Sequence, residues 1–173
     1  MTKSNHRGFT LIELMTVVFI IGMILTFASI SVGQHSDQTL EEEAKRLHYL
    51  IKLASEESVL RSTSLAMEFS KQGYQFVQIA GDQFVPLEGD KLFRKREFPG
   101  NGNMEIQMEL YGQTVSFDDE ERVPRIYILS SGEMTEFKIS LRLEESQPYI
   151  ITGNIIGQTK LLAPGTQSDE FGV

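Results

Sequence analysis

Cysteine is absent from the 173 residues, and so is tryptophan. Without cysteine, neither disulfides nor thiolate metal sites can stabilise the fold. Histidine is scarce: His6 lies near the N-terminus, and His35 and His48 stand too far apart for a pair of metal ligands on one helix. The sequence shows no nucleophile elbow, phosphate-binding loop or pair of catalytic acids. We therefore predict a protein that is not an enzyme and holds neither a metal nor a cofactor.

Charge is missing from one long segment near the N-terminus. Residues 14–34 carry no charged side chain, and the apolar stretch at 14–32 approaches the ~20 residues that a helix needs to cross a bilayer. Because Lys3 and Arg7 precede it, the positive-inside rule places the N-terminus in the cytoplasm and the rest of the chain across the membrane. The formal net charge of -8 gives a surface that repels nucleic acid unless a local patch overrides it.

One acid, Glu13, stands at the basic end of this apolar segment. An ionised carboxylate inside a membrane costs about 3 kcal/mol or more, so it needs a partner. Neither an ordinary secretory signal nor an uncleaved signal anchor explains its presence. If the chain is cut between Gly8 and Phe9, the new amine of Phe9 lies one helical turn away, about 6 Å along the axis. Glu13 can then neutralise an N-terminal amine, either its own or that of a neighbouring chain.

Residues 8–13 read Gly-Phe-Thr-Leu-Ile-Glu after a short basic leader, and this motif resembles the class III signal of type IV pilins and type II secretion pseudopilins. The resemblance implies that a membrane prepilin peptidase cuts after Gly8 and methylates the new N-terminal Phe9. It also implies that Glu13 helps to pair one subunit with the next. Many members of the family have proline where this chain has Ile30. The helix bending that accompanies this proline is therefore expected to be weaker or absent here.

Residues 38–62 contain neither proline nor glycine, and apolar or small side chains recur at three- and four-residue steps. This stripe consists of Leu40, Ala44, Leu47, Ile51, Ala54 and Ser58. We predict one helix that continues from the apolar segment to about Ser62 and whose stripe covers a sheet. The charged residues of this helix are expected on solvated or inter-subunit faces: Glu41, Glu42, Glu43, Lys45, Arg46, Lys52, Glu56 and Glu57.

The remainder of the chain alternates short apolar strands with polar turns. Predicted strands span residues 64–69, 74–79, 91–98, 104–110, 114–117, 125–129, 134–143, 149–153 and 160–162. The stretches "SKQG" at 70–73 and "SSGEM" at 130–134 are predicted turns. The fold class is therefore α+β: a long N-terminal helix, transmembrane in its first half and amphipathic in its second half, packed on antiparallel β-sheet.

These patterns divide the chain into five segments. They are a leader at residues 1–8 that is cleaved after Gly8, a transmembrane helix segment at 9–33, the amphipathic half of the helix at 34–63, a β-rich globular periplasmic domain at 64–162, and a flexible tail at 163–173.

Two charge clusters outside the helix are candidate binding surfaces. The acidic run at residues 118–121 offers oxygen ligands for calcium, but consecutive acids point in different directions, which favours a solvated loop. The basic segment, residues 91–98, interleaves Lys91, Arg94, Lys95 and Arg96 with Phe93 and Phe98. This pattern is typical of a surface for nucleic acid or for an acidic partner. A solvated strand face is the simpler interpretation, and an acidic neighbouring subunit suits an envelope protein better than DNA does.

Within the pilin and pseudopilin family, the chain most resembles the minor pseudopilin H group of type II secretion systems. The resemblance rests on the helix at residues 41–69 that leads into a hairpin and on "YILSSGEMTEFKISL" at 127–141. It implies a structural subunit of the periplasmic pseudopilus, which drives export of folded proteins across the outer membrane. The alternative is a minor type IV pilin that serves pilus biogenesis or DNA uptake.

The resemblance also implies partners and a location. The expected partners are the prepilin peptidase, the major and other minor pseudopilins, and the inner-membrane assembly platform, and no nucleic acid is expected. The chain is expected to cross the inner membrane once, with its N-terminus in the cytoplasm and its C-terminal domain in the periplasm, where it is incorporated into the pseudopilus.

Overall fold

The computed structural model describes residues 10–87, 89–100, 102–118 and 122–166. The chain forms two compact units, residues 1–36 and residues 37–173. The second unit is referred to as the domain. One helix, α1 (Leu11–Leu60), contributes to both units and runs through Ile30 without interruption. Among the described residues, no helix combines the length and the apolar character that a membrane crossing requires. The side chains of residues 25–36 and the leader at 1–8 lie outside the described part, so the predicted transmembrane segment stays a prediction.

Both ends of α1 are capped by local hydrogen bonds. At its start, the backbone N–H groups of Glu13 and Leu14 donate to the carbonyl oxygen of Thr10, at 3.1 and 3.2 Å. At its end, Thr63 N–H donates to Ser58 O at 3.0 Å and Ser62 N–H donates to Val59 O at 3.2 Å. This pair of bonds is a Schellman motif, in which the residue after the helix adopts a left-handed conformation. Ser62 takes that position with a φ of 52°.

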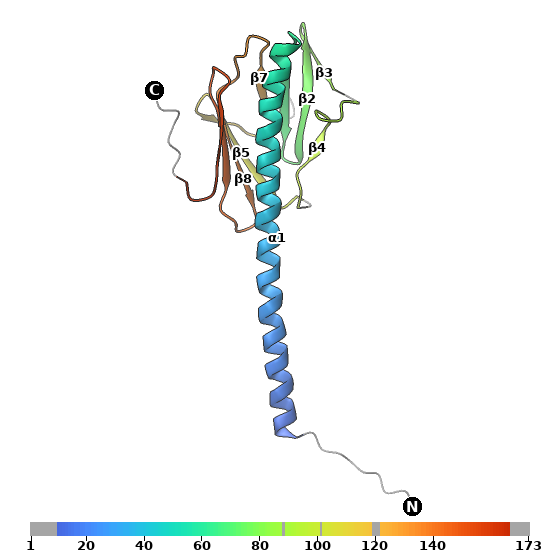
Figure 1. The fold of residues 1–173 in the computed structure, drawn as a ribbon, viewed down its shortest axis with the longest axis vertical. Helices are drawn as coiled ribbons and strands as arrows, with labels where there is room; N and C mark the ends of the chain where they lie inside the picture. Colours follow the sequence, from blue (N-terminus) through green and yellow to red (C-terminus); the bar gives the residue numbers. More distant parts are fainter. Residues whose placement is uncertain (1–9, 88, 101, 119–121, 167–173) are drawn as a thin grey trace, which may run out of the picture. The chain divides into compact units, whose positions relative to one another are not determined.

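The predicted stripe on the second half of α1 is confirmed as the face that packs on the sheets. Leu40 is 1% exposed, and the other five members from Ala44 to Ser58 have no exposed surface. The five apolar members of the stripe join one hydrophobic core with inward-facing residues from both sheets. In Figure 1, this part of α1 runs between β2, β3 and β4 on one side and β5 and β8 on the other. Burial of this apolar stripe removes its side chains from water and thereby stabilises the packing of the helix on the sheets.

The first sheet has the order β3-β2-β1-β7, and every neighbouring pair is antiparallel. Its strands are β1 (Leu65–Ser70), β2 (Gly73–Ala80), β3 (Gln83–Pro86) and β7 (Arg125–Ile128), with the short β4 (Arg96–Glu97) paired to the start of β2. The predicted turn at residues 70–73 closes the hairpin of β1 and β2, where Ser70 pairs with Gly73. A Cβ atom on Gly73 would lie 2.0 Å from the backbone oxygen of Arg96, so only glycine allows β4 to approach β2.

The second sheet is also antiparallel, with the order β10-β9-β8-β5-β6. It contains β5 (Met104–Leu110), β6 (Gln113–Thr114), β8 (Phe137–Leu143), β9 (Tyr149–Gly153) and β10 (Thr159–Leu162). Along β8, fully buried side chains alternate with more exposed ones, which is the pattern of a strand with one face on the core. The predicted fold class, a long helix packed on antiparallel sheet, is therefore confirmed.

Several details differ from the prediction. The strands form two sheets, and β3, in which no residue is buried, was not predicted. The predicted strand at 91–98 shrinks to β4, because a carboxylate oxygen of Asp90 accepts hydrogen bonds from the N–H groups of Leu92 and Phe93, at 2.8 and 3.2 Å, and turns the chain. The predicted strand at 114–117 is likewise reduced to β6. Met134 forms an isolated bridge with Ile128 before β8 begins.

Candidate assembly sites

The N-terminal half of α1 presents an apolar surface with one acid. Thr10 precedes the helix, and Glu13 N–H lies 3.4 Å from its hydroxyl oxygen, so the Thr-x-x-Glu sequence begins the helix as a capping box would. Glu13 is exposed in the first turn. The described large apolar side chains of this half are also exposed, from Leu11 at 79% to Ile24 at 61%. A surface of this kind needs a covering of lipid or of other chains. The predicted processing residues Gly8 and Phe9 lie outside the described residues.

The second half of α1 also carries an acid on its apolar face, but this one is buried. Glu43 is 1% exposed, and its carboxylate accepts a hydrogen bond from the Tyr74 hydroxyl at 3.0 Å and pairs with Arg46 at 2.5 Å. Burial, with Glu43 as the next cause, raises the pKa of the Tyr74 hydroxyl far above its usual range, so the hydroxyl remains a donor. The prediction that Glu43 is on a solvated or inter-subunit face is therefore wrong.

The sequence did contain a signal for this burial. Glu43 stands three residues after Leu40 and four before Leu47, which places it on the same helical face as the stripe. A carboxylate at such a position is stable only with donors close by. Its donor from the sheet, Tyr74, is 31 residues away in sequence, so the local pattern could not identify it.

The aromatic residues of the basic segment prove to be anchors in the core. Phe93 is 5% exposed and packs on Phe76 with ring centroids 4.9 Å apart, while Phe98 is 8% exposed and packs on Tyr74 at 5.6 Å. Buried rings cannot stack on nucleic acid bases. Of the cations and aromatic rings expected at a nucleic acid surface, the rings are therefore not accessible.

The cations of the basic segment divide into two groups. Lys91, Arg94 and Lys95 are exposed, and the structure gives them no ion pair within the described residues. Arg96 is half-buried, and one of its guanidinium NH2 groups lies 3.4 Å from the carbonyl oxygen of Leu92. The structure therefore brings three of the four predicted residues to the surface as unpaired positive charge and holds the fourth against the segment's own backbone.

The remaining candidates are His48 and the acidic run at residues 118–121. His48 is half-buried and lies 3.0 Å from the Thr159 hydroxyl of β10, and burial lowers the pKa of its imidazole. It is thus a structural contact between α1 and β10. Asp118 pairs with Lys71, and the rest of the acidic run at 119–121 lies outside the described residues. Across the described ranges, no group of His, Asp and Glu side chains is arranged to hold a metal ion.

Known proteins resemble this chain both at its N-terminus and over most of its length. A family model described as the prokaryotic N-terminal methylation motif matches residues 3–29. The type II secretion system protein H of Pseudomonas aeruginosa is 34% identical over 154 residues, which cover 82% of this chain and 85% of that protein. The protein H of Aeromonas hydrophila is 26% identical over 184 residues, which cover 99% and 93% of the two chains.

The fold has a solved counterpart as well. The crystal structure of the minor pseudopilin EPSH from the type II secretion system of Vibrio cholerae matches with a TM-score of 0.64 and 24% identity, and covers 76% of this chain and 99% of that chain. A methylation motif that opens a long helix, followed by antiparallel sheets packed on the second half of that helix, defines the class of pilin-like proteins. With a 34% identical relative over most of its length, the chain belongs to the type II secretion system protein H family, which comprises minor pseudopilins. The resemblance to the H group is thereby confirmed.

Proposed function

We propose that this chain is a structural subunit of the periplasmic pseudopilus, where it assembles with other pseudopilins to drive export of folded proteins across the outer membrane. The observation that carries the proposal is the 34% identity to a type II secretion system protein H over 82% of the chain. That relative is a secretion protein, which favours secretion over the alternative of a minor type IV pilin. The proposed role is one of assembly, and no chemical step is assigned to the chain.

The proposal includes a membrane anchor and a defined orientation. The N-terminal segment at 9–33 would cross the inner membrane, with the domain in the periplasm, because Lys3 and Arg7 precede the apolar stretch. The exposed apolar side chains of residues 11–24 support this proposal, since lipid or neighbouring helices would cover them. The assembly partners would be the major and other minor pseudopilins and the inner-membrane assembly platform.

Processing by the prepilin peptidase is the first step that the proposal requires. Cleavage between Gly8 and Phe9, followed by N-methylation of Phe9, would leave Glu13 in the first turn of the mature helix. Glu13 would then pair with the terminal amine of a neighbouring subunit as the helices pack side by side. The methylation motif that matches residues 3–29 supports this step.

The test of the proposed function is the substitution Gly8→Val in cells that carry the complete secretion system. A branched side chain at residue 8 should prevent cleavage, because the peptidase has to bind the backbone closely at the junction between Gly8 and Phe9, and a bulky side chain would obstruct this. Intact mass should then show the full-length precursor in the membrane, and secretion should be lost. The matched control Ser4→Val makes a similar change within the leader and should leave cleavage intact. A wild-type chain that is never cut would refute the proposed function.

The basic segment is proposed as a surface for an acidic neighbouring subunit. Its exposed residues Lys91, Arg94 and Lys95 have no ion pair among the described residues of a chain whose net charge is -8. Binding to DNA should be weak and should vanish at moderate salt, which a titration against salt concentration would measure.

A further inference from the structure

The strand β10 forms one edge of the second sheet, and among the described strands it pairs only with β9. This edge is less protected than those of β3 and β6. β3 ends on Pro86, which has no N–H group, and β6 has only 2 residues, whereas β10 has 4 residues and no proline. The backbone N–H and C=O groups of an edge strand pair readily with a further strand. The side of β10 that faces away from β9, called the open edge here, can therefore accept one.

The pairing with β9 determines which backbone groups of β10 point toward the open edge. Asn154 N–H donates to Gln158 O at 3.0 Å, so the pair that immediately precedes β10 is hydrogen-bonded. Hydrogen-bonded and non-hydrogen-bonded pairs alternate along an antiparallel ladder. The N–H and C=O groups of Lys160 therefore point toward β9, and those of Thr159 and Leu161 point toward the open edge.

A tight turn directly after β10 leads the chain back on the side of the open edge. Thr166 N–H donates to Ala163 O at 3.2 Å, and Gly165 has a φ of 76°. With Pro164 at the second position, these are the features of a type II turn, in which glycine supplies the positive φ. Ala163 stands two residues after Leu161, so its carbonyl oxygen points the same way, toward the open edge.

We propose that residues 167–171, which lie outside the described residues, fold back on the open edge of β10 as an additional antiparallel strand. The register of the turn places Asp169 opposite Lys160. Glu170 then lies opposite Thr159. A type II turn matches the twist of paired strands less well than its mirror image does, so the strand is held weakly. It is a displaceable cover that shields the edge from strands of other chains.

The charges on the outer face of the sheet support this register. Residues 167–173 contain two acids, Asp169 and Glu170, and no basic residue. Lys160 is exposed on the face of the sheet that points away from α1. Opposite charges that face each other directly across two strands stabilise the pairing, so Asp169 beside Lys160 favours the added strand.

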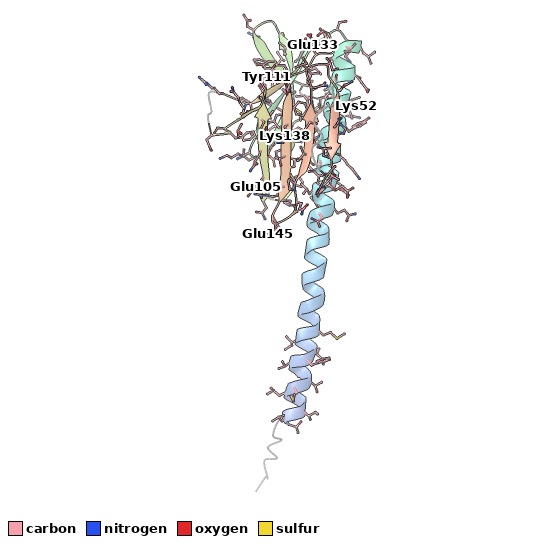
Figure 2. The ribbon with its side chains drawn as sticks, turned by 90° about the vertical axis from the view of Figure 1, so that its left-hand side faces the viewer. Lys52, Glu105, Tyr111, Glu133, Lys138 and Glu145 are labelled. Carbon is pink, nitrogen blue, oxygen red and sulfur yellow. The ribbon has the colours of Figure 1, made fainter. Side chains whose placement is uncertain are left out.

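The charges on the side of α1 support it as well. The Thr159 side chain faces α1, because its hydroxyl oxygen lies 3.0 Å from Nε2 of His48. Glu170, opposite Thr159, would share this face. Lys52 follows His48 by one helical turn and is exposed, without an ion pair to any described residue. Figure 2 shows Lys52 at the border between α1 and the second sheet, where Glu170 would meet it.

The inference goes beyond the proposed function and does not depend on it, because it concerns the domain alone. It gives a structure to most of the segment that the sequence predicted to be a flexible tail.

A pair of cysteines tests the register in the full-length chain, because the sequence contains no cysteine. The turn closes with a hydrogen-bonded pair, so Lys160 and Asp169 form a non-hydrogen-bonded pair, with Cα atoms about 4.5 Å apart, where a disulfide can form. We expect Lys160→Cys with Asp169→Cys to link within one chain when membranes are mildly oxidised. The loss of thiols that react with a maleimide measures this link.

The matched controls shift the second cysteine by one residue. Lys160→Cys is combined with Ser168→Cys or with Glu170→Cys, whose side chains point to the opposite face of the strand. Both controls should link at least about fivefold more slowly than the pair with Asp169→Cys. A tail without a fixed register would give equal rates at the three positions.

A charge exchange tests the contact with α1. In the chain with Lys160→Cys and Asp169→Cys, Lys52→Glu should slow the link about two- to fivefold, as expected for the loss of an exposed ion pair. Adding Glu170→Lys should restore the rate. Lys91→Glu makes the same change of charge on the basic segment and should have no effect.

Three results would overturn the inference. They are equal rates at residues 168, 169 and 170, a disulfide that joins two chains in place of one within a chain, and a rate that Lys52→Glu leaves unchanged. None of these results bears on the proposed function, because cleavage and secretion are measured separately.

Discussion

Each half of α1 places a single carboxylate on an otherwise apolar surface, but the carboxylate of the first half is exposed and that of the second half is buried. Glu13 in the first half is exposed, among exposed apolar side chains. Glu43 in the second half is buried, with Tyr74 and Arg46 as its partners. A buried acid with intramolecular donors stabilises one domain, whereas an exposed acid on a surface that must be covered is available to another chain. The same residue type therefore serves folding in one half and, as proposed, assembly in the other.

The largest expected effect comes from placing a new acid on the stripe of the second half. Leu47 has no exposed surface, and its replacement in Leu47→Asp has no partner such as Tyr74 provides for Glu43. The fragment 34–173 is expected to fold, and Leu47→Asp should destabilise it by about 4 kcal/mol or more. Urea unfolding monitored by circular dichroism would measure this. Equal stability of the variant and the wild type would show that the helix stripe does not hold the core.

A smaller loss is expected when the buried acid itself is removed. Glu43→Ala leaves the Tyr74 hydroxyl without its acceptor and should cost about 2–3 kcal/mol in the same unfolding assay. Tyr74→Phe removes only the donor and should cost about 1–2 kcal/mol. In the double variant the two losses should not add, because both substitutions break the same bond. Additive losses would mean that the 3.0 Å hydrogen bond contributes nothing to stability.

The corresponding test of the first half should change assembly and leave the domain unaffected. Glu13→Leu should still insert and be cleaved, since Gly8 and Phe9 are unchanged and the costly charge is gone. Co-purification with the major pseudopilin should fall about tenfold, because the neighbouring amine loses its counter-ion. Glu13→Gln, which keeps the shape without the charge, should behave like Glu13→Leu. If both variants assemble and secrete normally, Glu13 serves only the amine of its own chain.

The sequence could predict what depends on local periodicity. The six stripe residues are buried as expected, and β5 and β9 have the predicted bounds at 104–110 and 149–153. Glu43 was misplaced because its stabilising donor, Tyr74, comes from a strand far along the chain. The basic segment was predicted to be a strand, whereas the side chain of Asp90 turns the backbone there. A hollow lined by Tyr111, Leu129 and Ile155 depends on turns from both sheets, which meet only in the folded domain.

The smallest expected effect concerns the end of the second half, where the helix stops. Ser62 holds a left-handed φ of 52° that costs an ordinary residue about 1 kcal/mol or more, while glycine adopts it without strain. The greater freedom of glycine in the unfolded chain offsets part of this gain. We therefore expect Ser62→Gly to stabilise the fragment 34–173 by about 0.5 kcal/mol, which raises its melting temperature by about 2 °C.

Ser62→Ala keeps the strain and should give no gain, so calorimetry of the two variants separates relief of strain from loss of the hydroxyl. A gain from Ser62→Ala equal to that from Ser62→Gly would contradict the Schellman ending. In either variant the full-length chain should assemble as the wild type does, because the change leaves the first half of α1 and its acid untouched.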